Sequence, residues 1–323
     1  VTAMSAEASD MSGWLLMGLP GVAYWCGLAD AAWTAIGLAL GTYINWLLVS
    51  RRLRSYSIVS GDSITVPDFL SNRFHEKKKV ILGVSAIFIL IFFTVYAASC
   101  FVTCGKLFAG LFDLPYHAMM LVGAAFVLIY TILGGFLAES ASDFMQAIVM
   151  ILALLGVLIF GVSHAGGIGA VIDNAKDIPG FLSLTSIASP IVDTNGVQQT
   201  ANGIAQFGQA GSYGWITILS TLSWGLGYFG VPQVLLRFMA IRKGSELNRS
   251  RRIATVWCVI SLAAAVSIGI LGRKIFPFDA SLATQSASEN VFAQLSQLLF
   301  HPVVAGIIMA GILAATISSS DSY

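Results

Sequence analysis

The architecture of this chain is decided near its beginning, where it reads Ala8-Ser9-Asp10-Met11-Ser12-Gly13-Trp14-Leu15-Leu16-Met17-Gly18-Leu19-Pro20. Asp10 lies beside small hydroxyl residues and ahead of Gly and Pro, within an otherwise apolar segment. A carboxylate is costly inside a membrane and is kept where it faces partners, water or an ion. Helix breakers leave backbone N–H and C=O groups without their helical hydrogen bonds. At membrane depth such groups are tolerated only where they are buried in protein or line a cavity. The stretch therefore predicts a broken membrane helix with a small-cation site at the break.

The composition is that of an integral membrane protein. Of the 323 residues, 57% are hydrophobic and 10% are charged, whereas a soluble domain has about 25% charged residues. The net charge is only +1, so we expect no nucleic-acid partner. The sequence contains no Walker loop, HExxH or GxSxG motif, and we expect no enzyme activity.

Stretches without Asp, Glu, Lys or Arg predict eight transmembrane spans, because a span needs about 20 apolar residues. They are residues 11–29, 31–50, 80–105, 114–138, 144–172, 194–236, 253–272 and 290–320. The 194–236 stretch is too long for one helix and begins with polar residues, so its helix should start near Gly214. Because the chain begins and ends within apolar segments, we expect the full-length protein to extend at both ends.

The basic residues predict the orientation of these spans. Seven of the 17 Lys and Arg residues lie in the loop 50–79 and six in the loop 237–252. An even number of predicted spans separates these two loops, so both lie on the same side of the membrane. The other four lie on the opposite side. By the positive-inside rule, both basic loops are cytoplasmic. The long loop 165–213 is then extracytoplasmic, and its Gly, Asn and Gln content is typical of a covering loop with a short helix.

Two interrupted segments of the chain are similar. Ser12-Gly13-Trp14 followed by Gly18-Leu19-Pro20 matches Ser223-Trp224-Gly225 followed by Gly230-Val231-Pro232. Paired breaks in two halves are typical of inverted-repeat transporters, although Gly and Pro are also common in membrane helices generally. We expect one transmembrane domain, 1–323, with a first repeat of five spans (about 1–164), the loop 165–213 and a partial second repeat (214–323).

The polar end of the chain suggests a partner for Asp10. It reads Ala314-Ala315-Thr316-Ile317-Ser318-Ser319-Ser320-Asp321-Ser322. Sodium is a hard cation that prefers oxygen ligands, which adjacent serines and nearby carbonyls can supply. A serine cluster alone is weak support, because hydroxyls often bond across membrane helices. Together with the broken segment at Asp10, it predicts a cation site.

Two further groups of residues are candidates for function. Asp143, after Ser140-Ala141-Ser142, is either the N-cap of the fifth span or an acid on the ion's release path. Aromatic residues beside the broken segments favour a substrate pocket over interface packing, since their faces suit a small ring or a secondary ammonium. They are Trp14, Tyr96, Trp224 and Tyr228.

Several runs of this sequence resemble the sodium:solute symporter family, and its proline branch in particular. They are residues 9–21, 92–99, 134–138, 224–230 and 237–240, within a similarity that covers nearly the whole chain. The chain departs from that branch at Glu7, where a small or polar residue is usual, and at Ser319, where Thr is common. It also lacks the Trp that precedes Thr-Asp in the family pattern around Asp143.

The resemblance implies an all-α membrane protein with a five-plus-five inverted-repeat core, in which helices one and six are broken. It implies sodium-coupled import of L-proline across the bacterial inner membrane, with the lipid bilayer as surroundings and no obligate protein partner. The residues implied as sodium ligands are Ala8, Met11, Ala315, Ser318 and Ser319. Those implied for the substrate are Ser12, Gly13, Trp14, Tyr96, Trp224, Tyr228 and Pro232. Asp10 and Asp143 are implied in ion coupling.

Two alternatives stay open at the level of the sequence. One is a sodium- or proton-coupled symporter for another small solute, such as a different amino acid, pantothenate or a sugar. The other is a membrane sensor or channel built on the same fold.

Overall fold

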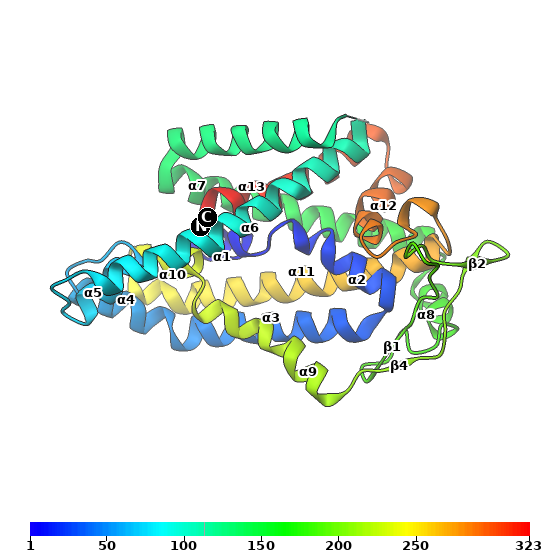
Figure 1. The fold of residues 1–323 in the computed structure, drawn as a ribbon, viewed down its shortest axis with the longest axis horizontal. Coiled ribbons are helices and arrows are strands. Elements are labelled where there is room, and N and C mark those ends of the chain that lie inside the picture. Colours follow the sequence, from blue (N-terminus) through cyan, green and yellow to red (C-terminus); the bar gives the residue numbers. More distant parts are fainter. Residues whose placement is uncertain (113) are drawn as a thin grey trace.

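The computed structural model describes residues 1–112 and 114–323 and is predominantly helical (Figure 1). Within these residues, five helices are long and apolar enough to cross a membrane. They are α3 (Leu28–Leu48), α6 (Val80–Phe112), α7 (Tyr116–His164), α11 (Leu247–Ile275) and α13 (Pro302–Ser322). In Figure 1, α3 and α11 lie side by side along the long axis of the molecule. The prediction of an all-α membrane protein is therefore confirmed.

Helix α7 consists of two antiparallel arms that correspond to the predicted spans 114–138 and 144–172. Gly135 lies between the arms with φ 60° and ψ −175°, a conformation that only Gly adopts readily. The Tyr130 hydroxyl donates to the Ala138 carbonyl at 3.5 Å. Eight residues of continuous helix would separate these groups by about 12 Å, so the chain turns back at Gly135, as Figure 1 shows.

The first predicted span is broken, as the sequence predicts. Helix α1 (Thr2–Asp10) stops where Met11 leaves the helical conformation. The Ser12 hydroxyl then accepts the Trp14 N–H at 3.3 Å and starts the short 3₁₀ turn η1 (Gly13–Leu15). Helix α2 (Gly18–Cys26) continues in the same general direction. The interruption thus covers the residues between Asp10 and Gly18.

The sixth predicted span is broken in the same manner. Helix α9 (Trp215–Leu222) begins directly after Gly214, where the sequence predicts a helix to start. It leads into the 3₁₀ segment η2 (Ser223–Phe229) and then into α10 (Pro232–Ala240), whose first residue is Pro. Proline is favoured in the first helical turn because its missing N–H would have no partner there.

Shorter elements lie at the two ends of the long helices (Figure 1). At one end are α4 (Ser50–Val59), α5 (Val66–Arg73) and the turn η3 (Gly244–Glu246). At the other end are α8 (Ile168–Lys176), η4 (Ala280–Leu282), η5 (Ala287–Asn290), α12 (Val291–Leu299) and the strands β1 (Ser186–Ile187), β2 (Thr200–Ala201), β3 (Ile204–Ala205) and β4 (Gly211–Ser212). Strand β1 pairs with β4 and β2 with β3, both antiparallel.

The last predicted span, 290–320, is not one helix. It is divided at residues 300 and 301 into α12 and α13, and α13 begins at Pro302. The division follows from Pro302, because a residue before proline is driven away from the helical conformation. His301 accordingly has φ −56° and ψ 143°.

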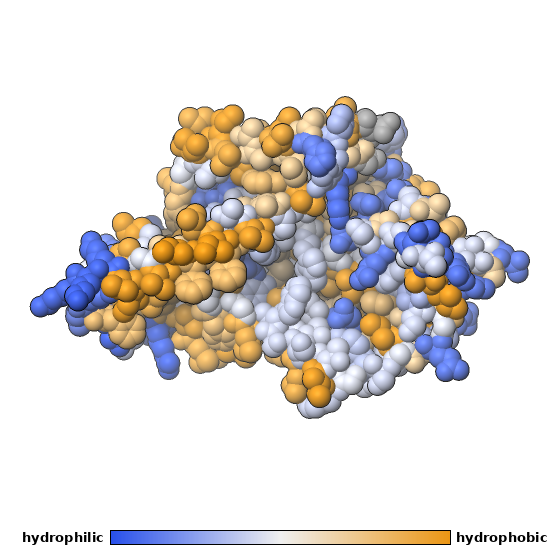
Figure 2. All heavy atoms as spheres, in the orientation of Figure 1, coloured by the Kyte–Doolittle hydropathy of each residue, from blue (hydrophilic) through white to orange (hydrophobic). Residues whose placement is uncertain are grey.

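The main apolar core surrounds the break in the first span. Side chains of α1, α2, the second arm of α7, α11, α12 and α13 form one buried cluster. By contrast, α6 presents many large apolar side chains outward, and Figure 2 shows a hydrophobic band over it between hydrophilic ends. Helix α3 and η2 approach each other at their backbones, since a Cβ on Gly225 would overlap the backbone of Gly37.

Candidate ion and substrate site

The ends of α1 and α13 meet at the broken segment of the first span. Ser318 Oγ on α13 lies 2.8 Å from the Ala8 carbonyl oxygen and 3.1 Å from the Ala315 carbonyl oxygen. All three residues are completely buried. Two helices that are 310 residues apart in the chain thus bring three of the predicted sodium ligands together.

The neighbouring Ser319 has an unsatisfied hydroxyl. Its side chain is 0% exposed, and its Oγ has no hydrogen-bond partner in the part of the chain that the structure describes. A buried hydroxyl without a partner costs about 1–3 kcal/mol, so such atoms are rare unless a ligand satisfies them. Hydroxyl and carbonyl oxygens are the ligands that sodium, as a hard cation, prefers. The oxygen atoms at this junction therefore fit a sodium ion.

A transition-metal site is not formed by the described residues. No group of three His, Cys, Asp or Glu side chains is gathered among them in a way that could hold such a metal. Zinc and related ions prefer nitrogen and sulfur ligands, which the α1–α13 junction does not offer. The oxygen donors of the junction are the kind that a hard cation prefers.

A cavity of about 330 Å³ lies directly beside the break, bordered by both interrupted spans and α6. Its lining consists of Asp10, Met11, Ser12, Trp14, Leu38, Tyr96, Ser99, Trp224, Gly227, Tyr228 and Val231. The rings of Trp14 and Trp224 have centroids 5.2 Å apart, and the Tyr96 hydroxyl donates to Ser12 Oγ at 3.4 Å. The four aromatic residues selected from the sequence all line this one cavity, together with Ser12.

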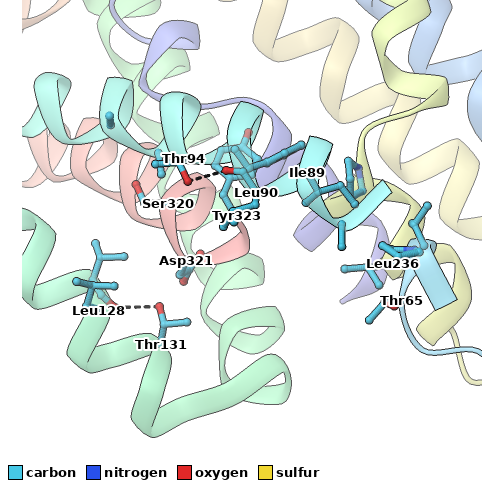
Figure 3. A pocket seen from close by; sticks show the side chains of 18 of the residues that line it. Thr65, Ile89, Leu90, Thr94, Leu128, Thr131, Leu236, Ser320, Asp321 and Tyr323 are labelled. Carbon is cyan, nitrogen blue, oxygen red and sulfur yellow. Dashed lines mark hydrogen bonds between the residues drawn. The ribbon is translucent and has the colours of Figure 1, made fainter. Parts of the chain in front are cut away.

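Two predicted substrate residues lie outside this lining. A Cβ added to Gly13 would come within 2.7 Å of Thr103 Cγ2 and 2.9 Å of Thr316 Oγ1, so Gly13 allows η1 to pack closely. Pro232 lines a separate cavity of about 820 Å³, between α5, α6, α7, α10 and the end of α13. Figure 3 shows this second cavity, with Thr65, Leu90, Asp321 and Tyr323 around it. Sequence position alone does not show on which side of the broken helix a residue lies.

Asp10 is oriented toward the sixth span. Its Oδ1 lies 3.5 Å from Gln233 Nε2 on α10, and the residue lines the 330 Å³ cavity. Met11 also lines this cavity, and its sulfur lies 4.0 Å from the Tyr228 hydroxyl. The other acid on α1, Glu7, points elsewhere and accepts a hydrogen bond from Trp46 Nε1 at 3.2 Å. The two carboxylates therefore have different surroundings although they are only three residues apart.

Asp143 is not an N-cap, so that interpretation of the sequence is wrong. It lies inside the second arm of α7 and is completely buried. Its Oδ2 accepts hydrogen bonds from Ser5 Oγ and Arg237 Nη2, both at 2.8 Å. Arg237 is also buried, and its Nη2 contacts Glu139 Oε1 at 2.7 Å. A buried network thus joins α1, α7 and α10 beneath the broken segment.

The sequence analysis missed two members of this region. Arg237 resembles the other basic residues of the loop 237–252 in sequence, and only the packing of α10 reveals its burial. Asp321 is 6% exposed, and neither of its carboxylate oxygens has a hydrogen-bond partner among the described residues. An acid three residues after Ser318 shares the same face of α13, and this spacing is a signal that could have identified Asp321.

Comparison with known proteins gives the family. The sequence pattern of the Sodium:solute symporter family matches residues 1–323. This chain belongs to the sodium:solute symporter family. Its relatives within the family include a protein named Sodium/proline symporter in Staphylococcus aureus strain USA300 / TCH1516 and another in strain COL. Each is 40% identical over 322 residues, which are 100% of this chain and 57% of the relative.

A solved structure of another transporter has the same fold. It is a substrate-bound, outward-open structure of a Na+-coupled sialic acid symporter, with a TM-score of 0.70 and 14% sequence identity. The match covers 99% of this chain and 62% of the other. At this identity the likeness shows a shared fold, which confirms the transporter architecture expected from the broken spans. The chain spans somewhat more than half the length of the symporters that it matches.

Proposed function

We propose that the protein containing this chain imports L-proline together with sodium ions by alternating access. Family membership and relatives named Sodium/proline symporter support the proposal. The cavity supports it as well, because aromatic faces suit a small ring with a secondary ammonium group. Backbone amides released at a helix break suit the carboxylate of an amino acid.

One observation carries most of this proposal. Ser318 already contacts the Ala8 carbonyl, and Ser319 beside it has a buried hydroxyl without a partner among the described residues. Sodium at this point would be held by the oxygens of Ala8, Met11, Ala315, Ser318 and Ser319. The ion would then join α13 to the end of α1 next to the substrate cavity.

The mechanism follows from this arrangement. Sodium entering from outside orders the broken segment, so that the cavity beside Asp10 binds proline more tightly. By linkage, proline strengthens sodium binding by the same factor. Movement of the broken spans against the other helices then exposes both ligands to the cytoplasm, where the low sodium concentration favours release. In this scheme Asp10 and Asp143 act on the ion through their charge.

The proposal also includes an orientation and an internal repeat. The loops 50–79 and 237–252 face the cytoplasm, and 165–213 faces outward across the plasma membrane. Residues 1–164 form the first repeat and 214–323 part of the second. The similar breaks at η1 and η2 support this division.

Sodium-dependent uptake in the full-length protein tests the proposed function. We expect Ser319→Ala to raise the sodium concentration for half-maximal proline uptake about tenfold, the size of a lost bond to a charged group. Ser320→Ala is the matched control, because the Ser320 hydroxyl is bonded within its own helix to the Thr316 carbonyl at 2.6 Å. Asp10→Asn should also weaken the sodium dependence.

The proposal would be contradicted by two results. One is an unchanged sodium requirement in both Ser319→Ala and Asp10→Asn. The other is a competition experiment in which unlabelled glucose or glutamate displaces bound labelled proline better than unlabelled proline does. That second result would keep the sodium site and replace the substrate.

A further inference from the structure

Gln233 lies between the ends of α1 and α13, in the first turn of α10. Its side chain is 2% exposed. Its Nε2 donates to Asp10 Oδ1 at 3.5 Å and to the Tyr323 hydroxyl at 3.3 Å. Its Oε1 has no partner among the residues that the structure describes. One buried amide therefore joins the carboxylate beside the cavity to the residue that follows α13.

Tyr323 extends this connection to two other elements. Its hydroxyl donates to the Ser9 carbonyl at 3.3 Å, one residue beyond Ala8. Its ring meets the ring of Tyr96 edge-on, with centroids 4.5 Å apart. Tyr96 lines the substrate cavity, and its hydroxyl donates a hydrogen bond to Ser12 Oγ. Tyr323 thus contacts both the α1 segment that forms the ion site and a wall of the cavity.

The position of Tyr323 couples it to the ion-site serines. Ser319 precedes it by four residues, about one helical turn. The three hydrogen bonds of Gln233 and Tyr323 are between 3.3 and 3.5 Å long and are therefore weak. Because they join α1, α10 and the end of α13 in turn, fixing α13 against α1 would hold all three in place.

We infer that Gln233 and Tyr323 are positioning residues through which sodium at the α1–α13 junction strengthens substrate binding in the cavity. The inference rests on the proposed function and deepens it, because it assigns the physical connection between the two sites. Sodium fixes α13 against α1, Tyr323 is held with α13, and Gln233 and Tyr96 hold Asp10 and Ser12 at the cavity wall. Neither residue needs to touch the ion.

The test measures coupling rather than activity. In the full-length protein, proline affinity is determined with and without sodium for the wild type, Tyr323→Phe, Gln233→Leu and the double variant. We expect each single variant to lower the ratio of the two dissociation constants about fivefold, as for one lost hydrogen bond. The double variant should lower it no further, because both residues act through one connection.

Tyr24→Phe is the matched control. The Tyr24 hydroxyl also donates to a backbone carbonyl, that of Phe276, at 3.2 Å, but it joins neither α1 to α13 nor the cavity wall, so its removal should leave the ratio unchanged. If sodium has no effect on proline affinity in the wild type, the proposed function is overturned, and the inference with it. If the wild type shows coupling and Tyr323→Phe retains it, the inference alone is overturned. Additive losses in the double variant would also overturn it.

Discussion

Single buried polar groups determine how the broken spans are held. Arg237 is 1% exposed and donates to Ser5 Oγ, the Gln233 carbonyl, Glu139 Oε1, Asp143 Oδ2 and Ser322 Oγ, all between 2.7 and 2.8 Å. A buried guanidinium is stable only when its donors and charge are matched in this way. One arginine thus links α10 to α1, α7 and α13.

Removing this arginine should be strongly destabilising. We expect Arg237→Gln to lower the free energy of unfolding by about 3–5 kcal/mol, because it leaves buried carboxylates at Glu139 and Asp143 without a cation. Unfolding in a denaturing-detergent titration measures the change. The matched control is Arg242→Gln, since Arg242 is 80% exposed and pairs with Glu246 at 3.4 Å. Equal losses in the two variants would contradict the structural role of Arg237.

Much of the candidate site could be predicted at the scale of single residues, but only where a residue is unusual for its own stretch of sequence. Asp10 and the serines after Ala315 are unusual inside apolar segments, and the aromatic residues flank helix breakers. Gln233, Arg237 and Tyr323 carry no such signal, because their importance comes from contacts between helices that are distant in the chain. Pro232 and Gly13 illustrate the reverse case, in which a residue lies in the expected segment but faces away from the cavity.

At the level of the elements, the breaks were predictable because Gly, Pro and small polar residues weaken a helix locally. The turn of α7 at Gly135 and the division before α13 at Pro302 also depend on residues whose backbone preferences are strong. The close contact between α3 and η2 was not predictable, because it depends on glycines of two separate elements, Gly37 and Gly225, facing each other.

This contact leads to a prediction for the element that it holds. In Gly225→Ala, the added Cβ would overlap the backbone of Gly37 and Gly41, which cannot give way as a flexible side chain can. We expect a loss of about 1–3 kcal/mol in stability, as for other overpacked sites. Proline binding should weaken too, because Trp224 and Tyr228 are on the same short segment.

Gly83→Ala is the control for that prediction. Gly83 lies within α6, and nothing lies within 4 Å of an added Cβ there. Alanine is the better helix former by roughly 0.5–1 kcal/mol, so this variant should be as stable as the wild type or more stable. Thermal unfolding in mild detergent compares the two variants. A Gly225→Ala protein with wild-type stability would show that α3 and η2 are not tightly packed.

For the whole molecule, the distribution of charge predicts its orientation in the membrane. The elements of both basic loops lie at one end in Figure 1, and α8 with the short strands lies at the other. Hydropathy and charge could predict which loops lie at the same end, because every span must be an apolar helix that crosses the whole membrane.

Cysteine labelling in intact cells tests the orientation. In a variant whose four native cysteines are replaced by serine, Asn195→Cys should react with a membrane-impermeant maleimide. Asp62→Cys, between α4 and α5, should react only after the cells are permeabilised. Both positions are exposed, so accessibility on each side depends on the membrane alone. The opposite labelling pattern would reverse the orientation and with it the direction of import.

The contact between Ser318 and Ala8 has a further consequence for the working cycle. The Ser318 hydroxyl donates its hydrogen to the Ala8 carbonyl oxygen at 2.8 Å. A sodium ion that bridges these two oxygens would take the place of that hydrogen, so the hydroxyl would have to turn and the ion would replace an internal hydrogen bond. In the proposed cycle this competition would shorten the time for which the ion stays bound and so favour its release into a sodium-poor compartment.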